Sequence, residues 1–177
     1  MIEEILEYNR KFVEEKGYEP YVTSKYPEDC NSELYGHPAY QSSSSSTGIK
    51  ERRCKMIKNA GGVITHPYGS VVRSLLVGIL ELGVEEVMVV GHTDCGVQGM
   101  NPKVLLKDLE ERGVEKKHID IIRNSGIDLE GWLAGFDSVE QSVEDTVFTL
   151  RNHPLMPRDV RIYGFIMDSI TGELKKI

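Results

Sequence analysis

The feature that most constrains the fold is a short apolar run, Val87-Met88-Val89-Val90, followed directly by Gly91-His92-Thr93-Asp94-Cys95-Gly96. An apolar run without alternation is typical of a strand covered on both faces, as in a parallel sheet flanked by helices. In open parallel sheets, ligands gather at the carboxyl ends of the strands. The residues just after this run are therefore the first candidates for a functional site.

Predicted helices and strands alternate along most of the chain. Apolar residues at near-helical spacing predict an N-terminal helical arm over 1–17, which packs on its own domain or on a partner subunit. Further helices are predicted over 70–82, 101–113, 114–123 and 138–151, and strands over 55–58, 87–90 and 160–167, with a final short edge strand after a turn at 168–174. This order predicts a single α/β domain over 1–177, with a mostly parallel β-sheet flanked by helices.

The segment 28–53 departs from this pattern. Its few apolar residues follow neither a helical nor a strand period, and it contains the serine run Ser42–Ser46. Such a stretch cannot bury enough surface to offset the entropy lost on ordering it. We therefore expect residues 28–53 to form a flexible loop.

Composition excludes several classes of protein. With 40% hydrophobic and 28% charged residues in 177, the chain has an ordinary globular mix rather than that of a disordered protein. A net charge of -7 without a basic run argues against nucleic-acid binding. No apolar run approaches the roughly 18 residues of a membrane span, and the N-terminus is acidic where a signal peptide would be basic. Three scattered cysteines, Cys30, Cys54 and Cys95, suggest free thiols or metal ligands in a reducing compartment, so a cytoplasmic protein is expected.

His92 and Cys95 are the candidate metal ligands. An imidazole and a thiolate at positions i and i+3 on one loop can turn toward a single point, and both are preferred ligands of zinc. A helix beginning near Cys95 would favour the thiolate. A lone His-x-x-Cys is a weak signal, however, because Cys95 could be a small buried hydrophobe and His92 a satisfied turn residue.

The run from Val89 to Gly96 resembles the second zinc-ligand motif of the β-class carbonic anhydrases, including their small prokaryotic branch. Other segments are also similar to that family: 1–27, 57–62, 73–75, 82–86 and 164–174. The resemblance covers about 1–27 and 55–177. It implies a Zn2+-dependent reversible hydration of carbon dioxide to bicarbonate, carried out by a homodimer.

The family's first motif, Cys-x-Asp-x-Arg, is missing. It supplies a zinc ligand and an Asp–Arg pair that helps order water and substrate, and it should fall between Pro27 and Lys55. Cys54 lies about 16 Å of strand from the expected site, whereas Cys30 lies in the expected flexible loop and could reach the metal. We therefore predict Cys30 as the third ligand, with His37 as another possible recruit.

Other residues have two interpretations each. Asp94 is a candidate catalytic residue that orients His92, or it caps the helix that follows. Gly61, Gly62 and Gly96 suggest close backbone approach in a substrate pocket, or they are ordinary turn residues.

Two functional alternatives remain open beside the enzyme. A catalytically impaired or non-catalytic zinc-binding relative, with a binding or regulatory role, is favoured by the missing motif. A thiol protein with a reactive Cys95 and no metal is the other. His118 and His153 lie on segments that are expected to be exposed, and neither is assigned a role.

Overall fold

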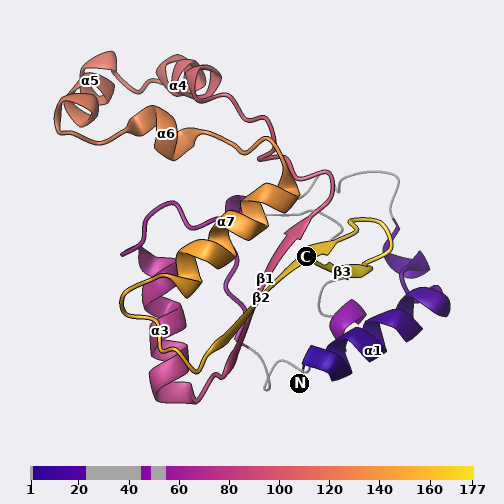
Figure 1. The fold of residues 1–177 in the computed structure, drawn as a ribbon. Helices are drawn as coiled ribbons and strands as arrows, with labels where there is room; N and C mark the ends of the chain where they lie inside the picture. The colour runs from indigo at the N-terminus through magenta and orange to yellow at the C-terminus, as the bar shows by residue number, and fades with distance from the viewer. Residues whose placement is uncertain (1, 23–44, 49–54) are drawn as a thin grey trace.

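The computed structural model describes residues 2–22, 45–48 and 55–177 (Figure 1). Helices and strands alternate as predicted, in the order α1 (Ile2–Glu14), η1 (Glu19–Tyr21), η2 (Ala60–Gly62), α3 (Ser70–Leu82), β1 (Glu86–His92), α4 (Pro102–Glu111), α5 (Lys116–Asn124), α6 (Leu129–Leu133), α7 (Val139–Arg151), β2 (Arg161–Met167) and β3 (Leu174–Lys176). The η elements are single 3-10 turns. The predicted α/β class is confirmed.

The sheet has the order β1-β2-β3 within the described part of the chain. β1 and β2 pair in parallel, with Glu86 opposite Arg161 and His92 opposite Met167, and β3 pairs antiparallel to β2. The strand predicted over 55–58 was wrong, because residues 55–59 have no regular secondary structure.

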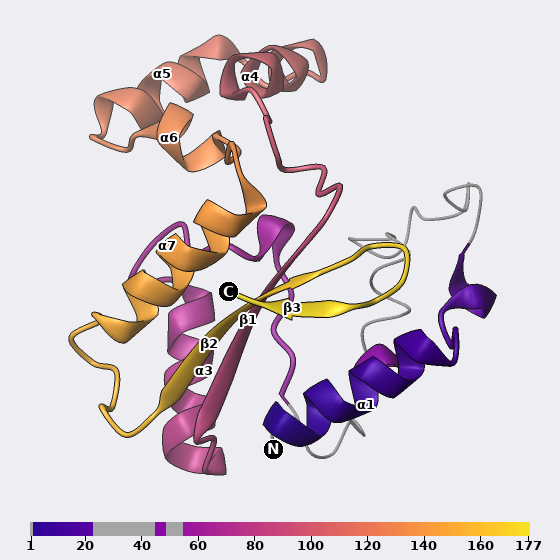
Figure 2. The ribbon, with the colours of Figure 1, turned by 45° about the vertical axis from the view of Figure 1, so that its right-hand side comes forward.

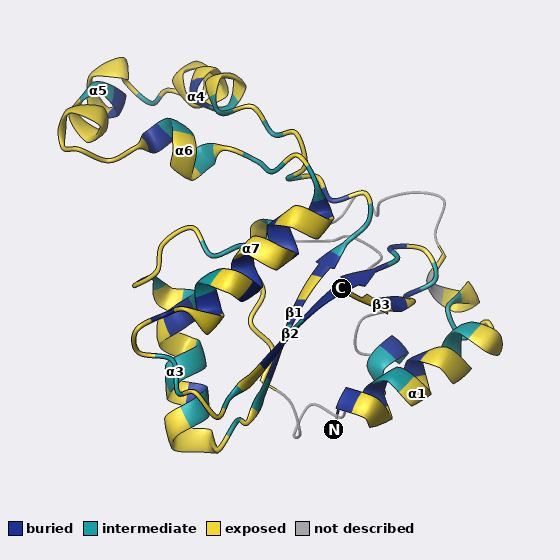
Figure 3. Ribbon diagram, viewed as in Figure 1, coloured by how far each residue is buried: buried dark blue, intermediate teal, exposed yellow. Residues whose placement is uncertain are grey.

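One face of the sheet packs against α7 and α3 (Figures 1 and 3). The side chains that form this core are Val72, Val87, Val89, Val139, Val143, Val147, Leu150, Ile162 and Ile166. Gly91 allows α7 to lie close to β1, because a Cβ at this position would stand 2.7 Å from Val143 and 2.8 Å from Val139. α7 begins at a capping residue, since the Ser138 hydroxyl accepts from the Gln141 amide at 3.3 Å.

The prediction that the strand over 87–90 is covered on both faces was wrong for Val90, and α3 also leaves apolar side chains exposed. Val90, which faces away from α7, is 36% exposed, so β1 is not covered on both faces by the described residues. In α3 only Val72 and Gly78 are buried, while Leu80 is 71% and Leu82 57% exposed. The helix contacts the core through one stripe, and the apolar residues outside that stripe remain on the surface.

The other face of the sheet receives α1 (Figure 2). Ile2 and Ile5 pack with Phe165, Met167 and Leu174, so the N-terminal arm lies on its own domain in this structure. Of the expected loop 28–53, the structure describes only residues 45–48, and 45–47 are helical rather than loop. Ser46 is completely buried there, and its carbonyl accepts a hydrogen bond from α1.

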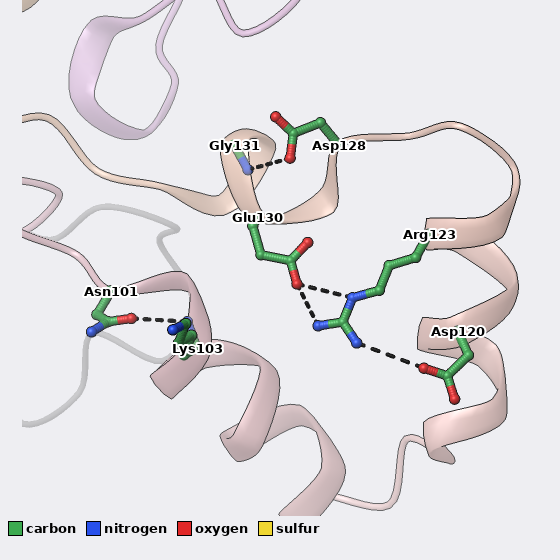
Figure 4. Close-up of polar contacts among 7 residues, drawn as sticks. All are labelled: Asn101, Lys103, Asp120, Arg123, Asp128, Glu130 and Gly131. Atoms are coloured by element: carbon green, nitrogen blue, oxygen red, sulfur yellow. Dashed lines mark hydrogen bonds and ion pairs between the residues drawn. The ribbon is translucent and has the colours of Figure 1, made fainter.

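Helices α4, α5 and α6 form a small group that stands apart from the sheet, beyond the N-terminal end of α7 (Figure 1). Their own core consists of Leu106, Ile119 and Leu129. Asn101 caps α4, accepting from Lys103 N at 2.9 Å, and Asp128 caps helix α6, which was not predicted (Figure 4). Arg123 pairs with Glu130, and this hydrogen bond lowers the pKa of the Glu130 carboxyl group.

None of the described helices has the length and apolar character needed to cross a membrane.

Candidate metal centre

His92 is the last residue of β1, and the chain turns immediately after it. Thr93 N donates to the Met167 carbonyl at 2.9 Å, which ties the start of the turn to the end of β2. The His92 ring nitrogen Nδ1 lies 2.8 Å from the Thr93 carbonyl oxygen. Because a carbonyl only accepts, Nδ1 carries the hydrogen of this bond, and the neutral ring has its lone pair on Nε2. This tautomer is the one that binds a metal through Nε2.

Cys95 lies in the same turn. Its side chain is 8% exposed and belongs to the main core, and its carbonyl accepts from Gln98 N at 2.9 Å. The next helix, α4, begins at Pro102 as predicted, so no described helix N-terminus lies beside Cys95 to favour its thiolate. The structure therefore places Cys95 as a sheltered thiol in a turn, which suits a metal ligand and a small buried hydrophobe alike.

Asp94 separates the two candidate ligands. It has a left-handed backbone with φ 55°, and its carboxylate accepts from the Ser169 hydroxyl at 3.4 Å. The predicted capping role was wrong, since no helix starts beside Asp94. His92 Nδ1 faces the Thr93 carbonyl, and the orienting role of Asp94 toward His92 stays a prediction.

The 3-10 turn η2 lies against the carboxyl end of β1. Gly61 and Gly62 have φ values of 73° and 65°, which favour glycine. A Cβ on Gly62 would stand 3.2 Å from the Val90 carbonyl oxygen, so the turn approaches the strand closely, as expected. Gly96 differs, because a Cβ there would meet no atom of the described residues within 4 Å.

The remaining predicted ligands, Cys30 and His37, lie outside the described residues, as does Cys54. Within ranges 2–22, 45–48 and 55–177, no three His, Cys, Asp or Glu side chains gather closely enough to hold a metal ion. The donor set that can be assessed is one imidazole with its lone pair on Nε2 and one sheltered thiol. Both are ligands that zinc prefers, and they need at least one more from elsewhere.

His153 has a structural role that the sequence did not reveal. It is 6% exposed, so the assignment to the surface was wrong, whereas His118 is exposed as expected. Its Nε2 donates to the Pro67 carbonyl at 2.9 Å, and its Nδ1 accepts from Leu155 N at 3.2 Å. The ring therefore joins the end of α7 to the loop before α3. Its connection to a loop 86 residues away gives no local signal.

Comparison with known proteins identifies the family. The family model described as carbonic anhydrase matches residues 45–174. Two proteins of Bacillus subtilis (strain 168), both named provisionally as carbonic anhydrases, are similar to the chain. YvdA is 43% identical, covering 96% of this chain and 87% of its own length. YtiB is 38% identical, and the match covers 100% of this chain and 96% of the length of YtiB.

Solved structures agree on the fold. A beta-carbonic anhydrase isoform I from Trichomonas vaginalis superposes with a TM-score of 0.71 at 24% identity, covering 100% of this chain and 97% of that one. The carbonic anhydrase from Glaciozyma antarctica superposes with a TM-score of 0.61 at 32% identity, and the match covers 75% of this chain and 72% of that one. With a turn carrying His92 and Cys95 at the carboxyl end of a parallel strand, the chain belongs to the β-carbonic anhydrase family.

Proposed function

We propose that the protein catalyses the zinc-dependent reversible hydration of carbon dioxide to bicarbonate. The observation that carries this proposal is the pairing, in one turn, of an imidazole whose lone pair is on Nε2 with a sheltered thiol. Family membership supports the same reaction. We expect His92 Nε2 and Cys95 Sγ to hold the metal, with Cys30 as the third ligand. When bound there, zinc would lower the pKa of a coordinated water to about 7, which would make hydroxide available at neutral pH.

The chain's own residues would provide the surroundings for this chemistry. Gly61 packs against the side chains of Phe136 and Val97, so apolar surface lies beside η2. Apolar surface of this kind would receive carbon dioxide and exclude water. We assign Gly61 and Gly62 to the substrate pocket, with Gly96 as a further member because it adjoins Cys95. Asp94 is the candidate catalytic residue, held through Ser169.

We also propose a homodimeric, cytoplasmic protein with a single domain. The exposed apolar side chains of α3, Val77, Leu80 and Leu82, support burial against a second copy. The free thiol of Cys95 suits a reducing compartment.

Carbon dioxide hydration by the zinc-loaded full chain, followed by stopped flow with a pH indicator, tests the proposal. We expect a rate well above the buffer background, falling at least about 100-fold in His92→Ala, because the metal loses a ligand. His118→Ala is the matched control, since this histidine is exposed and remote from the turn. Zinc-loaded protein whose hydration rate does not exceed the background would refute the proposed enzymatic activity.

A second candidate is a non-catalytic zinc-binding relative with a binding or regulatory role. The absence of Cys-x-Asp-x-Arg between Pro27 and Lys55 favours it, because the family's substrate-ordering Asp–Arg pair is missing with the motif. Stoichiometric zinc without hydration activity would support this candidate. Protein without zinc would instead favour a thiol protein that depends on Cys95.

A further inference from the structure

We propose that Ser169 is a positioning residue for the metal centre. Through Thr93 and Asp94, it holds the turn between His92 and Cys95 in the conformation that presents both ligands. This inference rests on the proposed zinc site and adds a residue from the C-terminal turn, which neither the sequence pattern nor the family resemblance assigned.

The contacts form a continuous chain of hydrogen bonds. Ser169 is 6% exposed, and its backbone N donates to Thr93 Oγ1 at 2.9 Å. The Thr93 hydroxyl donates to Ser169 Oγ at 3.1 Å, and the Ser169 hydroxyl donates to Asp94 Oδ2 at 3.4 Å. An ionised carboxylate only accepts, so Asp94 fixes the direction of both hydroxyl hydrogens. Each hydroxyl then donates once and accepts once.

The chain of bonds acts where the turn is under conformational strain. Asp94 has φ 55°, a left-handed conformation that is unfavourable for L-residues, although less so for Asp than for most. This residue determines how the backbone turns between His92 and Cys95. Because Ser169 binds both Thr93 and Asp94, losing its hydroxyl would free the turn to relax toward a less strained conformation. The two ligands would then be presented less often to one metal ion.

Ser169 can serve as an anchor because its own turn is held firmly. Asp168 Oδ1 accepts from Ile170 N at 2.9 Å and from Thr171 N at 2.7 Å. On the far side of this turn, the Asn9 side chain of α1 binds Gly172 O at 2.7 Å and Leu174 N at 2.9 Å. The turn between His92 and Cys95 is thus connected to a segment that is fixed by hydrogen bonds at both ends.

Zinc affinity and the cobalt spectrum of the full chain test the inference. Zinc dissociation constants are measured by competition with a chromophoric chelator, and the visible absorption of the Co2+-substituted protein reports ligand geometry. We expect Ser169→Ala to weaken zinc binding by roughly 10–100-fold, the range for residues that orient metal ligands, and to alter the cobalt bands. Ser125→Ala is the matched control, because that hydroxyl bonds to the Ile122 carbonyl on exposed α5.

The Thr93 variants separate positioning from a general effect on folding. Thr93→Val keeps the shape of the side chain but removes the hydroxyl, and it should weaken zinc binding as Ser169→Ala does. Thr93→Ser restores the hydroxyl and should restore the affinity. The double variant Thr93→Val, Ser169→Ala should bind zinc more weakly than either single one, but by less than the two single effects combined. Both single variants lose the bond between the two hydroxyls, whereas Ser169→Ala keeps the bond from Ser169 N and Thr93→Val keeps the bond to Asp94.

The outcomes distinguish this inference from the proposed function. If the wild-type chain binds zinc but Ser169→Ala binds it equally, with unchanged cobalt bands, the positioning role is refuted and the zinc site stands. Equal zinc affinities for Thr93→Val and Thr93→Ser would also refute it, even if Ser169→Ala does not fold. If the wild-type chain binds no zinc, the proposed function fails and this inference fails with it.

Discussion

Replacing Asn9 by alanine should destabilise the protein more than any surface change on α1. Asn9 is 3% exposed in the middle of the helix. Its Nδ2 donates to the carbonyls of Gly172 at 2.7 Å and Ser46 at 3.2 Å, and its Oδ1 accepts from Leu174 N at 2.9 Å. One side chain therefore joins three segments that are distant in the sequence.

The expected loss can be worked out from these contacts. A hydrogen bond contributes about 0.5–1.5 kcal/mol net, and more is lost when a buried partner is left unsatisfied. Three bonds, with Leu174 N and Gly172 O left behind, give a loss of roughly 2–4 kcal/mol in the free energy of unfolding. At about 2–4 °C per kcal/mol for a chain of this size, Tm should fall by roughly 5–15 °C.

Urea denaturation followed by circular dichroism measures this loss, and amide hydrogen exchange of α1 reports whether the helix undocks locally. Arg10→Ala is the matched control, because its ion pair with Glu7 is exposed, with side chains 66% and 52% accessible. That variant should change stability by less than about 0.5 kcal/mol. An Asn9→Ala protein with the control's stability and unchanged exchange in α1 would refute the reasoning.

Four further substitutions test other parts of the structure. Gly62→Ala should cost about 1–2 kcal/mol in unfolding free energy because of its left-handed backbone and the nearby Val90 carbonyl. Gly96→Ala should change it by less than about 0.5 kcal/mol, because no described residue lies within 4 Å of a Cβ there. Equal effects of the two substitutions in urea denaturation would contradict this. Burial acts to raise the pKa of Asp168, but hydrogen bonds from Thr171 and Ile170 outweigh it and lower the pKa below the ordinary 3.8. The stability advantage over Asp168→Asn should therefore be full above pH 3.8 and shrink as the pH falls through the lowered pKa; denaturation curves showing a gap that widens in acid would oppose this. His153→Phe should lower the free energy of unfolding by about 1–3 kcal/mol, because Pro67 O and Leu155 N lose their hydrogen-bond partner. A His153→Phe protein with the same Tm as the wild type would argue against that structural role.

Elements with local signals could be predicted from the sequence. The cap residues Asn101 and Ser138 marked the starts of α4 and α7 because capping depends on the next few residues alone. The strand predicted over 55–58 failed for the opposite reason. A strand needs a partner, and an apolar pair such as Met56 and Ile57 does not show whether one lies beside it.

Burial was harder to predict than secondary structure. An apolar residue at helical spacing can face a core or the surface, so the sequence could not show that Leu80 of α3 is 71% exposed. Likewise, His153 follows α7 in a segment that looks exposed, yet it is buried through a contact with Pro67. Both cases depend on which segment packs against the residue, and this is decided by the three-dimensional arrangement.

The candidate site was predicted only in part. His92 and Cys95 could be singled out because they follow a predicted strand and share one turn. The His92 tautomer could not, since it depends on the position of the Thr93 carbonyl. Ser169 gave no signal in the sequence, because its partner Thr93 lies 76 residues away along the chain. Long-range hydrogen bonds of this kind leave no spacing pattern in the sequence.

The zinc content of the full chain, purified without chelator, tests the central claim most directly. Elemental analysis should find about one zinc per chain in the wild type, the occupancy of a single site, and should find that zinc lost in His92→Ala and in Cys95→Ala. Cys54→Ala should retain the metal, because Cys54 was not predicted to reach the site. A wild-type chain without zinc, or full zinc content in both ligand variants, would contradict a metal centre at this turn.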